Sequence, residues 1–462
     1  MPTRKLVPLL VLAALTGCAS LASSPAPDRS VPADWTVNRQ SAPVPDASWW
    51  HSYQSAELNQ LIERARGDNL DLAAAAARLL QADAQVRQSG AALLPQLGAT
   101  LGGSRQDSQR LDADGNASRS SFNAGLSAAY EIDFWGRNRA AMSAAEAGLL
   151  AAGFDRDTLI LSTDAAVANS WFQLLEVRER LDLAQRSLTI AERVLELVEA
   201  RQRFGAADAL ELSQQRTLVA QLRSALPELQ QAELQLSNAL RVLLGAMPDS
   251  ELPSARLADI EVPTIGAGLP ADLLTRRPDI AASEARLLAA NADLTAARAA
   301  LFPSIQLTGQ YGMQSLALSG LLSDPVTAWT LAAGLTQPIF QGGRLRAQVD
   351  LSEARQQELL VDYRRSVVAA LADTDTALGA ARQTGETYQF LDEANQQAER
   401  AFRLAEVRYR EGAITLQTLL DAQRTWYQSR DTLARQRSAQ LQASVALYRA
   451  LGGGWSGSAV SY

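Results

Sequence analysis

"NLDLAAAAARLLQADAQVRQSGAALLPQL" (residues 69–97) has a counterpart 208 residues later, "RPDIAASEARLLAANADLTAARAALFPSI" (residues 277–305). Both stretches carry a proline two residues before their end, Pro95 and Pro303, and strand-like alternation follows each. Self-similarity at a fixed spacing identifies a repeated structural unit. The sequence therefore predicts a duplicated fold.

The two repeats are expected to span residues 51–250 and 277–455, with residues 251–276 as an equatorial linker between them. Each repeat contains a helix, two strands and a long helical hairpin, in that order. In the first repeat, we expect strands at about 96–104 and 122–133 and a hairpin at 139–245. In the second repeat, we expect strands at about 304–313 and 329–339 and a hairpin at 343–451.

The first hairpin begins with an unusually long helical pattern. Residues 139–204 contain no proline, and apolar side chains recur there three and four residues apart in two parallel series. At the helical rise, this helix would be about 100 Å long, and the return helix at 208–245 about 57 Å. Two apolar series predict a neighbouring helix on each side, and hence a hollow cylinder of helices. A single wide apolar face in an ordinary bundle is the alternative.

Glycines mark the two hairpin turns. Gly205 in "RFGAADALELSQQRTL" (203–218) and Gly412 in "REGAITLQTLLDAQRTW" (410–426) interrupt long helical patterns and lie 207 residues apart. Glycine just beyond the last helical residue is a common helix stop signal. The sequence therefore predicts one reversal of direction in each repeat, with a carboxylate a few residues beyond each glycine.

The four strand candidates have one apolar face and one small or polar face. In "FNAGLSAAYEID" (122–133), apolar and polar or small residues alternate throughout. Segments of about ten such residues are typical of strands that cross an outer membrane. A soluble half-buried sheet is the alternative. Four strands are too few to close a barrel, so oligomerisation follows: two chains would give eight strands, and three would give twelve.

The N-terminus resembles a bacterial lipoprotein signal. Residues 1–17 contain Arg4 and Lys5, then a short apolar run, and "LTGC" ends in Cys18. We expect a lipid on Cys18, a tether at 18–50 and an outer-membrane location, because no aspartate follows the cysteine. Residues 456–462 are expected to form a C-terminal tail.

Composition argues against several function classes. Removal of the signal peptide changes the formal charge from −7 to −9, which argues against nucleic acid as a partner. The mature chain would have no lysine, and His51 and Cys18 are its only histidine and cysteine. Schiff-base chemistry, a P-loop and a histidine–cysteine metal cluster are therefore excluded. We expect no enzyme activity, and no cofactor apart from the covalent lipid.

Several stretches together resemble the TolC-like outer-membrane efflux proteins, in particular the lipoprotein branch that serves resistance-nodulation-division drug pumps. They are "LTGC", "WWHSY", "NLDLAAAAARL", "RRPDIAASEARLLAANADL", "ALFPSI", "LLDAQR" and "ALGGGW". The resemblance implies an α+β membrane protein that forms a homotrimer. Its twelve-stranded transmembrane β-barrel would continue into a twelve-helix periplasmic α-barrel, which docks with a periplasmic adaptor and an inner-membrane pump.

The resemblance also implies a gate at the periplasmic end. Asp421 would form a ring of three carboxylates, and Glu211 would occupy a comparable place beyond the first turn. Arg424 would pair with a carboxylate, Tyr409 would brace the closed form, and the turns at Gly205 and Gly412 would dock the adaptor. The alternative for the charged residues is a solvated charge at a helix tip, and the alternative for Tyr409 is an aromatic side chain that only packs. The list of candidate residues is therefore Cys18, Gly205, Glu211, Tyr409, Gly412, Asp421 and Arg424.

The expected function is passive export of drugs or other small molecules. Two alternatives stay open at this point. One keeps the duct but changes its cargo to metal ions or to a secreted protein. The other is a lipid-tethered coiled-coil scaffold without a pore, although a scaffold needs neither the four alternating strands nor the duplicated turns.

Overall fold

The computed structural model describes residues 31–36, 45–109 and 116–457. Contacts divide the chain into residues 1–30 and residues 31–462, and only the second unit is described below. The predicted signal peptide at 1–17 and the predicted lipid site at Cys18 lie outside the described residues. Most of the predicted tether and tail also lie outside them.

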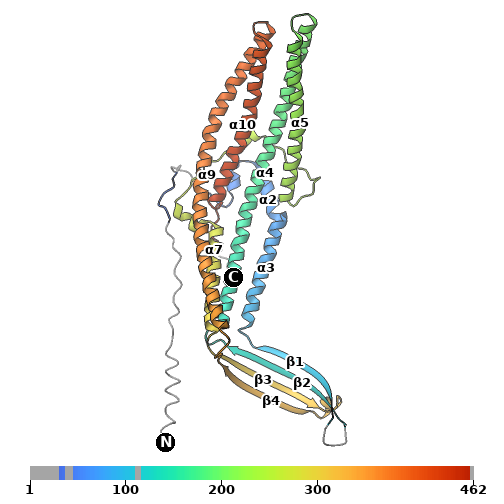
Figure 1. Ribbon diagram of the computed structural model, residues 1–462, viewed down its shortest axis with the longest axis vertical. Coiled ribbons are helices and arrows are strands. Elements are labelled where there is room, and N and C mark those ends of the chain that lie inside the picture. Colours follow the sequence, from blue (N-terminus) through green and yellow to red (C-terminus); the bar gives the residue numbers. More distant parts are fainter. Residues whose placement is uncertain (1–30, 37–44, 110–115, 458–462) are drawn as a thin grey trace. The chain divides into compact units, whose positions relative to one another are not determined.

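The first repeat begins with a short 3-10 helix, η2, at Trp49–Tyr53. Its remaining elements follow in the predicted order (Figure 1): α2 (Ala56–Asp68), α3 (Leu70–Ala91), β1 (Gln96–Gln109), β2 (Asn116–Ile132), α4 (Arg137–Arg203) and α5 (Ala209–Leu243).

The second repeat has the same plan. A linker with short helical segments at Leu257–Asp259 (η3), Pro270–Asp272 (η4) and Leu273–Arg276 (α6) leads into it. Its elements are α7 (Pro278–Ala299), β3 (Ser304–Ser315), α8 (Gly320–Ser323), β4 (Val326–Thr336), α9 (Arg344–Arg410) and α10 (Leu416–Ala450).

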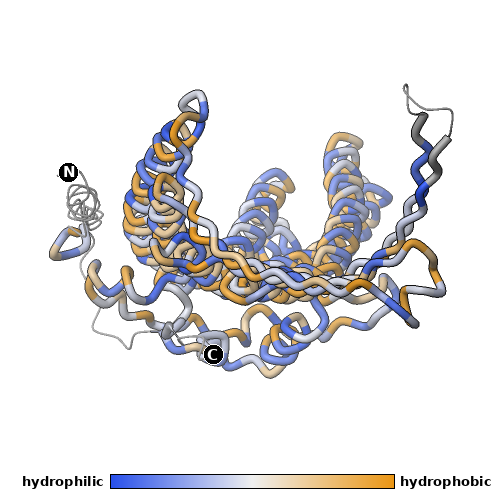
Figure 2. The backbone as a smooth tube through the Cα atoms, turned by 90° about the horizontal axis from the view of Figure 1, so that it is seen from below, coloured by the Kyte–Doolittle hydropathy of each residue, from blue (hydrophilic) through white to orange (hydrophobic). Residues whose placement is uncertain are grey.

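Helix lengths confirm the duplication. The long helices α4 and α9 each have 67 residues, and the return helices α5 and α10 each have 35. The short helices α3 and α7 each have 22. Figure 1 shows the two hairpins with their turns at one end and the sheet at the other. In Figure 2, the helices lie side by side in one curved layer.

The four strands form one antiparallel sheet in the order β1-β2-β3-β4. The register places apolar residues of all four strands on the same face, since Leu126 pairs with Tyr311 and Tyr311 pairs with Trp329. These side chains are exposed, Trp329 to 76% and Leu97 to 84%. An exposed apolar face of this extent indicates a membrane or another subunit as its surroundings.

Several strand boundaries differ from the prediction. The first strand was expected to end at about 104 and the second to begin at about 122, but β1 extends to Gln109 and β2 begins at Asn116. The sequence there is polar, so apolar alternation could not reveal that the strands continue to pair. The fourth strand was expected at 329–339, but β4 ends at Thr336, because Pro338 has no N–H to donate to a neighbour.

The largest apolar core lies where η2 and α2 pack against α4 and α10. Trp49, Trp50 and Tyr53 are buried there together with Trp171 and Phe172 of α4. The Tyr53 hydroxyl and the Ser444 hydroxyl of α10 are 2.7 Å apart and share a hydrogen bond. His51, in the same short helix, is exposed.

An ion pair borders this core. Arg66 of α2 makes a two-pronged contact with the buried Asp164 of α4, with a shortest N–O distance of 2.6 Å. The guanidinium of Arg66 also lies over the Trp50 ring, 4.2 Å from its centroid. These contacts hold η2 and α2 against the long helix α4. Among the described helices, none has the length and apolar composition needed to cross a membrane.

Candidate functional site

The two hairpin turns have the same backbone geometry. Gly205 has φ +71° and Gly412 has φ +75°, in the left-handed region that glycine adopts without steric cost. In each turn, the N–H of the residue after the glycine donates to the carbonyl five residues earlier, over 2.8 Å. This pairing ends both long helices as Schellman motifs. The turns predicted at these two glycines are therefore present.

The return helices also start alike. Asp208 caps α5 by accepting the Glu211 N–H over 2.8 Å, and Thr415 caps α10 by accepting the Thr418 N–H over 3.4 Å. Glu211 is thus the counterpart of Thr418, not of Asp421. Since Glu211 is three residues closer to its turn, the two carboxylates differ by about 4.5 Å in height along their helices. Glu211 and Asp421 do not occupy comparable places.

Tyr409 lies at the meeting point of the two hairpins. Its ring is buried, and the guanidinium of Arg201, from the last turn of α4, lies over it at 4.7 Å from the centroid. Arg201 also donates a hydrogen bond of 3.1 Å to the carbonyl oxygen of Tyr409. An arginine of the first repeat therefore binds both the ring and the backbone of a tyrosine of the second.

Glu211 belongs to this group. Burial raises the pKa of Tyr409, and the negative charge of Glu211 raises it further. The Tyr409 hydroxyl and one Glu211 carboxylate oxygen are both buried, and neither has a hydrogen-bond partner among the described residues. Buried polar atoms without partners are costly. We call Arg201, Glu211 and Tyr409 the tip cluster.

Apolar side chains of α4, α5, α9 and α10 pack around the tip cluster. Phe402 stacks on Trp426, with ring centroids 4.8 Å apart, and Leu419 and Val198 are buried beside them. Tyr427 of α10 donates a hydrogen bond of 3.0 Å to the carbonyl oxygen of Ser187 in α4. The tips of the two hairpins are therefore joined by packing as well as by charge.

Asp421 lies on the exposed side of α10. Its carboxylate is 57% exposed and forms an ion pair of 3.8 Å with Arg424. The amide nitrogen of Gln417 donates to both carboxylate oxygens, each over 3.1 Å. Arg424 thus has the carboxylate partner that the sequence analysis suggested. Among the described residues, no hydrogen bond or ion pair connects this group to Glu211 or Tyr409.

Arg201 was missed by the sequence analysis. A signal was present, because Arg201 and Arg408 occupy the same position before the two turns and basic residues favour the last turn of a helix. The sequence does not show which of these two arginines contacts the other repeat. That choice depends on how the hairpins pack.

A single protein-family model matches each of the two repeats separately. The model of the outer membrane efflux protein family matches residues 61–246 and again residues 269–453. These two ranges coincide with the two structural repeats and cover most of the chain. The chain belongs to the outer membrane efflux protein family.

Relatives and solved structures extend the match over nearly the whole chain. A pyoverdine export outer membrane protein of Pseudomonas putida is 47% identical, over 92% of each chain. A toluene efflux pump outer membrane protein of the same species is 33% identical, over 96% and 95%. The crystal structure of the open MtrE outer membrane channel of Neisseria gonorrhoeae is 32% identical, with a TM-score of 0.85 over 95% and 98%.

Membership of the outer membrane efflux protein family fixes the function at a coarse level. The protein is located in the outer membrane and acts in efflux as a channel component. The family and the relatives are transport proteins rather than enzymes. Within such a channel, the tip cluster and the Asp421 group are two charged features of the hairpin ends.

Proposed function

We propose that the chain forms a homotrimeric exit duct, closed at the periplasmic end by the hairpin tips, that exports small organic molecules. It would act with a periplasmic adaptor and an inner-membrane pump. The main support for the gate is the contact of Arg201 with Tyr409, which joins the two hairpins at their tips.

The sheet supports the oligomer. Its outer strands β1 and β4 have no partner on one side in the single chain, and an exposed strand edge readily pairs with another chain. Three copies would supply twelve strands with apolar side chains such as Leu97, Leu126 and Trp329 directed to lipid. The polar residues on the other face, such as Gln310, would then line the duct.

The proposed gate has two parts. The tip cluster holds the two hairpins of one chain together, and three copies of Asp421 place negative charge around the axis. Charged rings of this kind select ions in pores. Adaptor binding at the turns, where Phe204 is exposed, would favour the open arrangement through a higher affinity for it.

The proposed lipid on Cys18 would hold the chain at the membrane without spanning it. The duct would then need no cofactor, because conduction is passive. A cargo of small organic molecules is supported by the relatives named for pyoverdine export and toluene efflux. A cation efflux protein of Escherichia coli, 30% identical over 98% and 99%, keeps metal ions as the alternative cargo.

Single-channel recording in planar bilayers tests the duct and its gate. The wild-type protein should conduct ions, and Asp421→Ala should raise its conductance and reduce its preference for cations. Glu393→Ala removes an exposed carboxylate of α9 far from the turn and should change neither property. A wild-type protein that does not conduct contradicts the duct. Equal behaviour of the two variants excludes Asp421 from the constriction.

A further inference from the structure

A pocket lies where the start of α4, the second half of α7 and the start of α9 meet, close to the sheet. Its volume is about 620 Å³, within the range of sites that bind small organic molecules. The α4 and α7 sides of the pocket are lined largely by alanines. Larger side chains at these positions would fill the space between the helices. These residues are Ala141, Ala290, Ala296 and Ala297.

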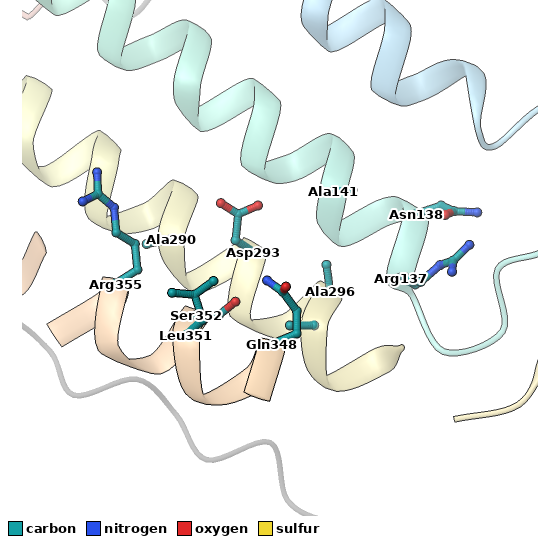
Figure 3. Close-up of a pocket in the computed structure, with 11 residues that line it drawn as sticks. Arg137, Asn138, Ala141, Ala290, Asp293, Ala296, Gln348, Leu351, Ser352 and Arg355 are labelled. Carbon is teal, nitrogen blue, oxygen red and sulfur yellow. The ribbon is translucent and has the colours of Figure 1, made fainter. Parts of the chain in front are cut away.

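Asp293 is at the centre of the pocket lining (Figure 3). Among the described residues, none forms a hydrogen bond or an ion pair with its carboxylate. Two arginines also line the pocket, but each has another partner: Arg137 pairs with Glu131 over 2.7 Å, and Arg355 pairs with Glu358 over 2.6 Å. In Figure 3, neither guanidinium points toward Asp293. The uncompensated charge of the pocket is therefore a single negative one.

The surroundings of Asp293 strengthen its attraction for a cation. The walls remove part of its hydration, and this desolvation raises the pKa of the carboxyl group. A charge in a less polar environment interacts more strongly with an opposite charge than it does in bulk water. Asp293 is otherwise exposed, so a ligand that brings a positive group reaches its carboxylate from solvent.

We propose that this pocket binds an organic cation. The ammonium or iminium group would contact Asp293, and the apolar body would lie against Leu351 and the alanines. Gln348 and Ser352 supply polar groups at the α9 side. The inference rests on the proposed duct for the route by which such a cation arrives, and it gives the duct a binding site for cationic cargo at the helix ends next to the sheet.

Other ligand classes fit the pocket less well. A calcium ion takes six to eight oxygen ligands, usually with several carboxylates, and the pocket offers one. Among the described residues, no group of three or more metal-binding side chains exists. An anion would need a free guanidinium, and both arginines of the pocket are already paired.

Ethidium is a suitable probe, because it is a flat organic cation whose binding changes its fluorescence polarisation. The purified full-length oligomer in detergent should bind it, and Asp293→Asn should weaken the affinity at least tenfold. Asp350→Asn removes an exposed carboxylate from the same end of α9, outside the pocket, and should change the affinity less than twofold. The anionic dye fluorescein should not bind.

A second variant tests the space rather than the charge. Ala296→Phe fills the pocket without altering its charge, and it should also abolish ethidium binding. Absence of binding to the wild type, or equal affinities of Asp293→Asn and Asp350→Asn, overturns the proposal. Conductance measured on the same preparations separates the two hypotheses: a conducting wild type with unselective ethidium binding refutes the cation site and leaves the duct intact.

Discussion

The guanidinium of Arg201 covers the ring of Tyr409 at 4.7 Å and donates a hydrogen bond to the Tyr409 carbonyl oxygen over 3.1 Å. These residues end the long helices of different repeats, so one side chain joins the two halves of a duplicated chain at their tips. Separation of the hairpins breaks both contacts at once. In the proposed gate, the strength of this pair therefore contributes to the cost of opening.

Replacement of Arg201 by methionine should favour the open arrangement. Methionine keeps much of the apolar stem but removes the cation–π contact and the charged hydrogen bond, together about 2 kcal/mol. At 1.4 kcal/mol per factor of ten, the ratio of open to closed tips should rise about thirtyfold for each chain, and by more for a channel whose three tips open together. Single-channel recording measures this ratio directly.

Arg203→Met is the matched control, since Arg203 is exposed in the same helical turn and makes neither contact with Tyr409. It should leave the open probability unchanged. If the two variants behave alike, the contact with Tyr409 does not hold the tip closed, and the gate must be sought in the Asp421 group.

Gly412→Ala should destabilise the second turn by about 1 kcal/mol, because an L-residue is strained in the left-handed conformation. No atom lies within 4 Å of the added methyl group, so the backbone angle alone causes the loss. Hydrogen exchange of the turn amides is the suitable measurement, and their exchange should become about fivefold faster, since 1 kcal/mol corresponds to about that factor.

Gly379→Ala supplies the opposite case within the same long helix. This glycine lies in the interior of α9, and its added methyl group also meets no atom within 4 Å. Alanine is the better helix former by about 1 kcal/mol, so amides around residue 379 should exchange more slowly. Faster exchange in both variants would mean that crowding by the added methyl group, rather than the φ angle, controls stability at these sites.

Substitution of Arg66 and substitution of Asp164, which form an ion pair, should reduce stability by unequal amounts. Asp164 is 1% exposed, whereas Arg66 is 39% exposed. Arg66→Met leaves a buried carboxylate without its partner, at a cost of about 3–5 kcal/mol. Asp164→Asn should cost less, because Arg66 keeps its contact with Trp50 and reaches solvent. Thermal unfolding of the two purified variants measures the difference.

Acid should partly rescue Arg66→Met. Burial raises the pKa of Asp164 above the usual carboxyl value even with Arg66 present, so the folded chain holds this proton more tightly than the unfolded chain. The penalty is full above the folded pKa and disappears as the pH falls below the unfolded value, about 3.9. A variant whose deficit is the same at pH 4.5 and pH 8 would contradict a charge-based penalty.

The sequence predicted those features that depend on one repeat alone. Helix lengths and turns could be located because Gly205 and Gly412 interrupt otherwise continuous patterns. The role of Arg201 could not be predicted, because it depends on which helix ends meet across the repeats. The pocket at Asp293 was missed for the same reason, since α4, α7 and α9 come from distant parts of the chain.

Tyr427 should make the tip sensitive to alkali. Burial raises its pKa from 10.0 to about 12, while the unfolded phenol ionises near 10. An acid whose pKa is raised by folding favours the unfolded state once the pH exceeds the unfolded value. Stability should therefore fall between pH 10 and pH 12, by up to about 2.7 kcal/mol for two pH units.

Tyr427→Phe removes this ionisation but also two hydrogen bonds, the one of 3.0 Å to Ser187 and the one of 2.6 Å from Gln423, at a cost of about 2 kcal/mol at neutral pH. The variant should thus start less stable and lose less stability as the pH rises, so that the two denaturation curves cross between pH 10 and pH 12. Tyr388→Phe, at another tyrosine of the hairpins, should follow the wild type throughout. Stability depends on pH only through groups whose pKa differs between the folded and unfolded chain. If the wild type and Tyr427→Phe lose the same stability between pH 10 and pH 12, a group other than Tyr427 causes the loss.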